Sequence, residues 1–238
     1  MGCEKPLYKR VLLKMSGEAL AAGGSGLYNY EFVARVASVV KKCLDMGVQI
    51  GVVVGAGNIW RGRQGGSMDR GRADHMGMLA TVINSLALQD AFIQAGIDAR
   101  VMAASEMKNA CEYYTRDKAI SHLEKGRVVI FGGGLGTPFF STDTAAAVRA
   151  AEIGADVMLM AKNIDGIYSA DPRVDKDAKR YDRISYTDIL AGGLRAIDST
   201  ATAFCMDANL PIFVFSLADE HNIYRAMLGE CGGTTVTK

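Results

Sequence analysis

Three glycine-rich segments contain residue types that are suited to binding phosphate. They are KMSGEA (14–19), GAGNIWRG (55–62) and GGGLGTPFFSTD (132–143), and each follows a short apolar run. Glycine lets the backbone approach a ligand closely, and the N-terminus of a following helix offers free N–H groups and a positive dipole end to an anion. Three such loops at one sheet edge favour a polyanionic ligand such as the phosphates of a nucleotide.

Two common nucleotide-binding motifs are missing from this sequence. There is no GxxxxGK[ST] segment, and GAGNIW has Trp60 where a dinucleotide motif has its third glycine. Lys14 ends the first apolar run beside Ser16 and Gly17, so its ammonium can reach a phosphate as a point charge. A lone lysine at a strand end is more often solvated, but the Ser–Gly pair favours the phosphate role.

Composition and charge exclude several other classes of function. The 238 residues carry a net charge of +1, which gives no sign of nucleic-acid binding. The five cysteines form no CxxC motif, and the three histidines have no zinc-site spacing, as expected for free thiols in a reducing cytoplasm. Neither a signal peptide nor a run of about 18 apolar residues is present, so we expect a cytoplasmic protein without a membrane span.

Alternating strand and helix patterns predict the fold. Buried strands are expected at 8–14, 48–55, 97–104, 127–131, 155–161 and 211–216, with an edge strand in GGTTV near the C-terminus. Helices are expected at 30–46, 73–96, 116–125, 142–154, 186–191 and 198–208. Residues 163–186 are polar and rich in turn residues, as in hairpins or an excursion from the sheet. We therefore predict a single domain, residues 1–238, forming a three-layer αβα sandwich with a mainly parallel sheet. In such sheets ligands bind beyond the carboxyl ends of the strands.

The segments KMSGEAL, VVVGAGNIWRG, DHMGMLATVINSLALQD, GGGLGTPFFSTDTAAAVRAAEIGAD and NIDGIYSADP, in this order, resemble the bacterial uridylate kinases of the amino acid kinase superfamily. The resemblance covers residues 8–235. It implies transfer of the ATP γ-phosphate to UMP, with Mg²⁺ held mainly by the nucleotide phosphates and no metal ligands from the protein. It also implies an acceptor-binding half at roughly 1–160 and an ATP-binding half at roughly 161–238.

The resemblance assigns catalytic roles to Lys14, Arg61, Asp143 and Asp198. Asp198 matches the acid that holds Lys14, and it is also a candidate helix N-cap. Asp143 is suited either to ordering the phosphate site through water or to charging the first turn of its helix. The residues matching the ATP site are Lys14, Met15, Ser16, Gly17, Gly57, Arg61, Lys162, Asn163, Tyr168 and Asp171. Some superfamily members have a second lysine at position 162, where many uridylate kinases have threonine.

The residues matching the UMP site are Ala56, Asp74, Gly134, Leu135, Gly136, Thr137, Pro138, Phe139, Phe140 and Ser141. Asp74 matches the acid that accepts hydrogen bonds from the ribose, and helix N-capping is its alternative role. Ala56 replaces the more usual glycine, which would cost energy if the position needs a positive φ. Thr137 replaces a common asparagine, so recognition of the base could be altered. The two phenylalanines would form an apolar wall beside the pyrimidine.

The helix at 73–96 is apolar on more than one face, which indicates either a deeply buried helix or a subunit interface. The resemblance places it in a dimer interface within a homohexamer, a trimer of dimers. It also brings GTP as an activator and UTP as an inhibitor, with the GTP region at Ala22, Gly23, Gly24, Ser25, Gly26 and Leu27. A flexible loop is the alternative for that glycine-rich stretch.

Two other functions remain open from the sequence. A kinase of the same superfamily could phosphorylate a carboxylate or a carbamate, which would give an acyl phosphate. A nucleotide-binding or storage protein could use this fold without turnover. Asp74 and the TPFFST segment favour a nucleotide acceptor, and Lys14, Asp143 and Asp198 favour catalysis.

Overall fold

The computed structural model describes residues 5–21, 26–61 and 66–238. Within them the main sheet has the strand order β4-β3-β5-β2-β1-β6-β10-β11-β9. All of its neighbouring strands pair in parallel except β10 and β11, which are antiparallel. The strands are β1 (Arg10–Met15), β2 (Gln49–Val54), β3 (Ala99–Ala103), β4 (Glu112–Tyr113), β5 (Val128–Gly132), β6 (Val157–Lys162), β9 (Arg183–Ser185), β10 (Ile212–Ser216) and β11 (Thr234–Thr237).

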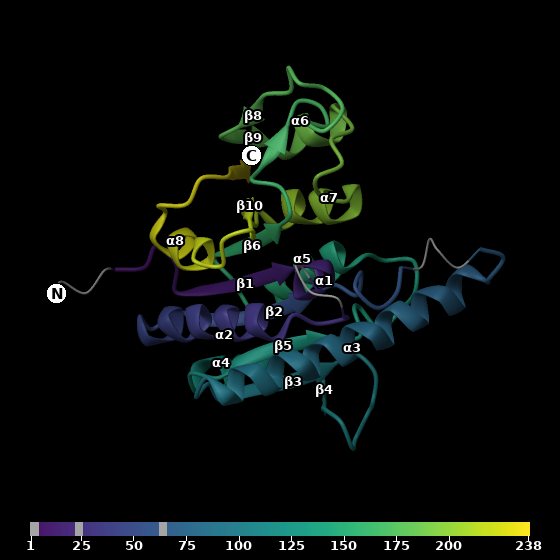
Figure 1. Ribbon diagram of the computed structural model, residues 1–238, viewed down its shortest axis with the longest axis vertical. Helices are drawn as coiled ribbons and strands as arrows, with labels where there is room; N and C mark the ends of the chain where they lie inside the picture. The colour runs from purple at the N-terminus through teal and green to yellow at the C-terminus, as the bar shows by residue number, and fades with distance from the viewer. Residues whose placement is uncertain (1–4, 22–25, 62–65) are drawn as a thin grey trace.

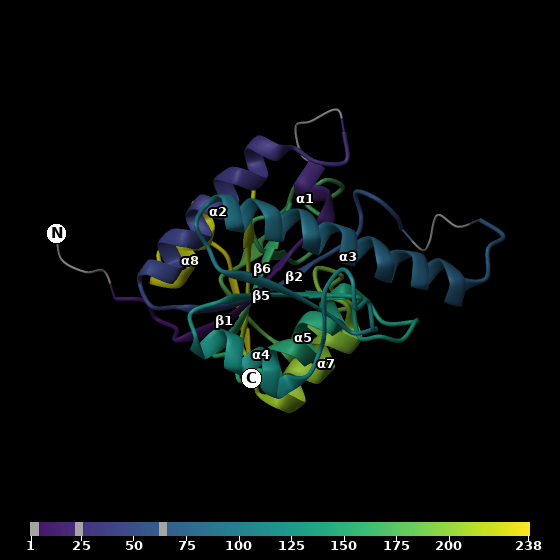
Figure 2. The same cartoon turned by 90° about the horizontal axis from the view of Figure 1, so that it is seen from below.

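Helices cover both faces of this sheet, as Figure 2 shows from below. One face carries α1 (Gly17–Ala21), α2 (Tyr30–Asp45), α3 (Arg70–Gln94) and α8 (Asn222–Leu228), and the other carries α4 (Arg116–Glu124), α5 (Thr142–Glu152) and α7 (Ser199–Ala208). Helix α6 (Tyr186–Ala191) packs against α7, near the hairpin of β7 (Ile167–Tyr168) and β8 (Arg180–Tyr181) (Figure 1). The predicted three-layer α/β class is confirmed, whereas the single-domain division stays a prediction.

The alternation of side chains along the central strands positions two lysines. In β1, Leu13 packs into the hydrophobic core beneath α2, while Leu12 packs into the core on the α5 and α7 face. Lys14 shares the face of Leu12, since side chains two residues apart point the same way. In the neighbouring strand β6, Met160 packs into that same core, so Lys162 follows on the same face. Both lysines therefore emerge at the carboxyl ends of adjacent strands.

Several local predictions need correction. The GGTTV strand, β11, lies between β10 and β9 instead of at the edge of the sheet. Helix α3 begins at Arg70, and its N-cap is Asp69, whose side chain accepts a hydrogen bond from the backbone N–H of Arg72. Asp74 therefore lies inside the helix and does not cap it. Strand β4 and helix α1 were not expected, because each is too short to show a periodic pattern.

Helix α3 is long and apolar enough, by length and composition alone, to cross a membrane. This is weak support for a span, because the core helix of a soluble protein passes the same test. Here α3 packs against β5, β3 and α2 and carries the fully buried polar residues Asn84 and Ser85. These contacts are those of a helix that packs one side against the core of a folded domain.

Candidate active site

One buried carboxylate bridges the two lysines at the strand ends. Nζ of Lys14 lies 2.6 Å from Oδ1 of Asp143, and Nζ of Lys162 lies 3.1 Å from Oδ2 of the same residue. Burial alone would raise the pKa of Asp143, but the charges of Lys14 and Lys162 outweigh it and hold that pKa well below its usual range. Burial also lowers the pKa of Lys162, and Asp143 opposes this shift. The result is a compact cluster with two positive charges and one negative charge.

Asp198 lies beside this cluster with different partners. Its side chain caps α7 by accepting a hydrogen bond from the backbone N–H of Ala201, which confirms the predicted N-cap. It also accepts hydrogen bonds from the hydroxyls of Ser141 and Thr144 at the start of α5. The acid that holds Lys14 is therefore Asp143, where the sequence assigned this contact to Asp198. Asp143 acts by direct ion pairs, because the N-terminus of α5 places its carboxylate between β1 and β6.

A cavity of about 490 Å³ opens beside the hairpin of β7 and β8. Tyr168 and Asp171 line it, as the predicted ATP site requires, while Asn163 is exposed and does not line it. Asp171 pairs with Arg173 at 2.9 Å. Residues 192–196 also line this cavity, and the sequence analysis missed them because their only signal was the Gly-Gly turn. Lys162 donates a hydrogen bond to the carbonyl of Ala196, which joins this part of the cavity to the lysine cluster.

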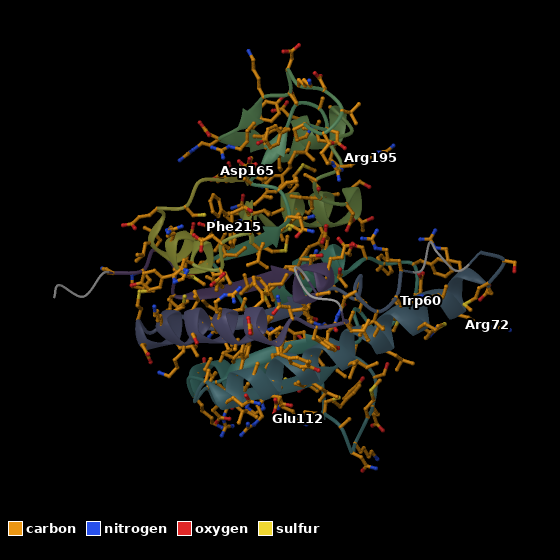
Figure 3. The ribbon with its side chains drawn as sticks, in the orientation of Figure 1. Trp60, Arg72, Glu112, Asp165, Arg195 and Phe215 are labelled. Atoms are coloured by element: carbon orange, nitrogen blue, oxygen red, sulfur yellow. The ribbon has the colours of Figure 1, made fainter. Side chains whose placement is uncertain are left out.

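A second cavity, of about 200 Å³, lies between the loops that follow β2 and β5. Of the predicted UMP-site residues, it is lined by Ala56, Asp74, Gly134, Thr137, Pro138, Phe140 and Ser141. Gly57 and Arg61, which were assigned to the ATP site, line this cavity instead of the larger one. Leu135, Gly136 and Phe139 of the predicted UMP site do not line it. Trp60, Met78 and Thr81 are lining residues that the sequence analysis missed. In Figure 3, Trp60 beside α3 and Arg195 near α7 lie on the same side of the molecule.

The loop after β5 has an unusual backbone at Phe139. This residue has φ of 74°, a conformation that costs a non-glycine residue energy, and its side chain is exposed. Its backbone N–H donates a hydrogen bond of 2.9 Å to Oδ2 of Asp74, and the guanidinium of Arg70 lies over its ring. Ala56, in contrast, is not among the described non-glycine residues with positive φ, so alanine is not strained there.

The first and second glycine loops touch each other. A Cβ added to Gly17 would lie 2.3 Å from the carbonyl oxygen of Gly55, so only glycine fits this close approach. Glu18, in α1, forms an ion pair with Arg61 that the sequence analysis did not foresee. Met15 is fully buried, so neither its side chain nor its backbone is exposed to a ligand. Ser16, which follows it, is half-buried and has its hydroxyl and backbone N–H next to Lys14.

The described residues of the expected GTP region lie outside these two cavities. Ala22, Gly23, Gly24 and Ser25 of the expected GTP region fall outside the described residues, while Gly26 and Leu27 are exposed. Among the described residues there is no group of three or more His, Cys, Asp or Glu side chains suited to holding a metal ion.

Comparisons with known proteins agree with this architecture. The sequence model of the amino acid kinase family matches residues 9–216, and the chain belongs to this family. The structure is similar to that of a UMP kinase from Bacillus anthracis, with a TM-score of 0.92, 37% sequence identity, and coverage of 97% of this chain and 96% of that one. It is also similar to a UMP kinase from Ureaplasma parvum, with a TM-score of 0.92, 33% identity, and coverage of 97% and 99%. A uridylate kinase from Archaeoglobus fulgidus is more distant, with a TM-score of 0.74, 27% identity, and coverage of 95% and 99%.

Proposed function

We propose that this protein is a UMP kinase, which transfers the γ-phosphate of ATP reversibly to UMP and forms UDP and ADP in pyrimidine nucleotide biosynthesis. The observation that carries the proposal is the Lys14–Asp143–Lys162 cluster between two cavities. Lys162 contacts Ala196 in the wall of the larger cavity, and Thr142, next to Asp143, lines the smaller one. ATP would occupy the larger cavity and UMP the smaller, with the transferred phosphoryl group at the lysines.

Phosphoryl transfer needs positioning and charge neutralisation more than covalent help from the protein. The ammonium groups of Lys14 and Lys162 would balance the charge on the transferred group, and Asp143 would hold both lysines in place. The backbone of Ser16 and Gly17 would bind the phosphates of ATP. Arg61 lines the acceptor cavity, and its planar guanidinium can donate two hydrogen bonds to phosphate oxygens. Mg²⁺ bound to the ATP phosphates would supply further positive charge.

The acceptor cavity has features suited to a nucleoside monophosphate. Oδ2 of Asp74 is engaged by the loop at Phe139, which leaves Oδ1 for the ribose hydroxyls. Phe140 and Trp60 provide apolar surface for the base, and the hydroxyl of Thr137 is the candidate group for reading its edge. A small carboxylate or carbamate acceptor would leave this surface unused. These features favour UMP over the acyl-phosphate chemistry of other family members and over a storage role without turnover.

The remaining expectations concern assembly, regulation and location. Met76, Leu79, Ile83 and Ile93 of α3 are apolar and exposed, as expected for an uncovered interface. We propose that this face pairs with a second copy of the chain and that three such dimers form a hexamer. GTP as an activator, UTP as an inhibitor and a cytoplasmic location complete the proposal.

The test is an assay of ADP release with MgATP and a panel of acceptors: UMP, CMP, dTMP, AMP, acetylglutamate and aspartate. UMP should give the highest kcat/KM, and hydroxylamine should trap no acyl phosphate. A clear preference for another acceptor, or ADP release that does not depend on the acceptor, would overturn the proposal.

A further inference from the structure

The buried side of helix α3 carries polar groups in an order that matches the two loops of the smaller cavity. Asp74, Thr81 and Asn84 are spaced by seven and three residues, which places them on one side of the helix. We refer to these three side chains, with the backbone carbonyl of Ala73, as the polar face of α3. Each of these groups forms a hydrogen bond with a loop that lines the cavity.

Asn84 holds the loop after β2. Its side chain is fully buried, and its Nδ2 donates to the carbonyl of Gly55 at 2.7 Å and to Oδ1 of Asn58 at 2.8 Å. Its Oδ1 accepts hydrogen bonds from the hydroxyl of Tyr28 and from Nδ2 of Asn58. The indole N–H of Trp60 reaches the carbonyl of Ala73 at 2.8 Å. This loop is thus tied to α3 at Gly55, Asn58 and Trp60.

Thr81 and Asp74 hold the loop after β5. The buried backbone N–H of Gly133 donates to Oγ1 of Thr81 at 2.9 Å, and the N–H of Phe139 donates to Asp74. The hydroxyl of Thr81 donates in turn to the carbonyl of Met78 in its own helix. Loss of such a partner leaves a buried polar group unsatisfied, which costs more than the net value of the bond. One rigid helix therefore holds both walls of the cavity.

We propose that Asn84 and Thr81 are positioning residues, which hold the loops of the acceptor cavity at the separation that the acceptor nucleotide requires. Asn84 does not line the cavity, so its effect must pass through Gly55 and Asn58. The proposal rests on the assignment of this cavity to UMP. Neither residue lines the larger cavity, so a positioning role predicts an effect on the acceptor alone. A general loss of stability would affect both substrates.

The test compares Asn84→Asp and Thr81→Val with Ser85→Ala. Ser85 is a matched control, because it is fully buried on the same helix and its hydroxyl donates only to the carbonyl of Thr81, among the bonds of the described residues. Both test variants should raise KM for UMP about tenfold, while KM for MgATP and kcat change less than about threefold. Ser85→Ala should leave all three near the wild-type values, and Thr81→Ser, which keeps the hydroxyl, should restore KM. Equal increases in both KM values, or the same change in Ser85→Ala, would overturn the proposal.

Hydrogen exchange on the protein without nucleotides separates this proposal from the proposed function. Amides in the segments 55–60 and 133–139 should exchange faster in the two test variants, while those of β10 should not. If the wild type does not phosphorylate UMP, this measurement still decides whether α3 positions the loops. Unchanged exchange in both segments would refute the positioning role. If Asn84→Asp does not fold, Asn58→Ala removes the same amide link from a half-buried position and takes its place.

Discussion

Nζ of Lys14, at the end of β1, lies 2.6 Å from Oδ1 of Asp143, in the first turn of α5. The same carboxylate binds Lys162, from the neighbouring strand β6. The cluster thus brings together the end of one helix and the ends of two parallel strands. Its net positive charge is suited to a transferred phosphoryl group.

Replacing Lys14 with alanine should lower kcat by about 100-fold or more, because it removes a charge that acts mainly on the transferred group in the transition state. The affinity for UMP, measured by calorimetry without ATP, should change less than about threefold, since Lys14 does not line the smaller cavity. An equally large loss of UMP affinity would contradict this placement of Lys14. Lys9→Ala is the control, because Lys9 precedes β1 at the end of that strand opposite to Lys14 and lines neither cavity.

Replacing Asp143 with asparagine should destabilise the protein by about 3 kcal/mol at neutral pH, because two buried ammonium groups lose their counter-charge. The folded-state pKa of Asp143 is lowered from 3.8, so its stabilising effect is fully present above that pH and is lost as the pH falls toward the folded-state pKa. The difference in free energy of unfolding between wild type and variant should therefore shrink as the pH falls below about 4. Urea unfolding from neutral to acid pH measures it. A difference that grows below about pH 4 would contradict the assignment.

We expect substitutions of Thr137 to change the discrimination between uracil and cytosine in the acceptor. Thr137→Asn adds an amide that both donates and accepts, so the ratio of kcat/KM for UMP over CMP should rise about tenfold. Thr137→Val keeps the shape of the side chain and removes its hydroxyl, so the same ratio should fall. Steady-state kinetics with both nucleotides tests the pair. Identical ratios in the two variants would show that Thr137 does not contact the base.

The exposed apolar face of α3 predicts that charged substitutions there will change the oligomeric state. Leu79→Glu and Ile83→Glu place charges where a second copy would pack, so they should break the proposed hexamer into smaller species in light-scattering experiments. Val174→Glu introduces the same change at a residue of 84% exposure near the β7–β8 hairpin and should leave the assembly intact. A wild-type chain that is monomeric at high concentration would exclude this interface.

The sequence by itself determined the layers of the fold and marked the loops that line the smaller cavity. Alternating strand and helix periods identified the α/β class, and glycine at strand ends marked the loops, because both signals are local. The N-cap at Asp198 was also readable, since a capping residue precedes its own helix.

Tertiary structure alone decided which charges meet. Asp143 and Asp198 are both acids at helix starts, and only the packing of α5 against β1 and β6 places Asp143, instead of Asp198, on the lysines. The cavity wall at Gly192–Ala196 and the pairing of Glu18 with Arg61 likewise join residues distant in sequence. Such contacts depend on how strands and helices pack in three dimensions, and a periodic pattern carries no information about them.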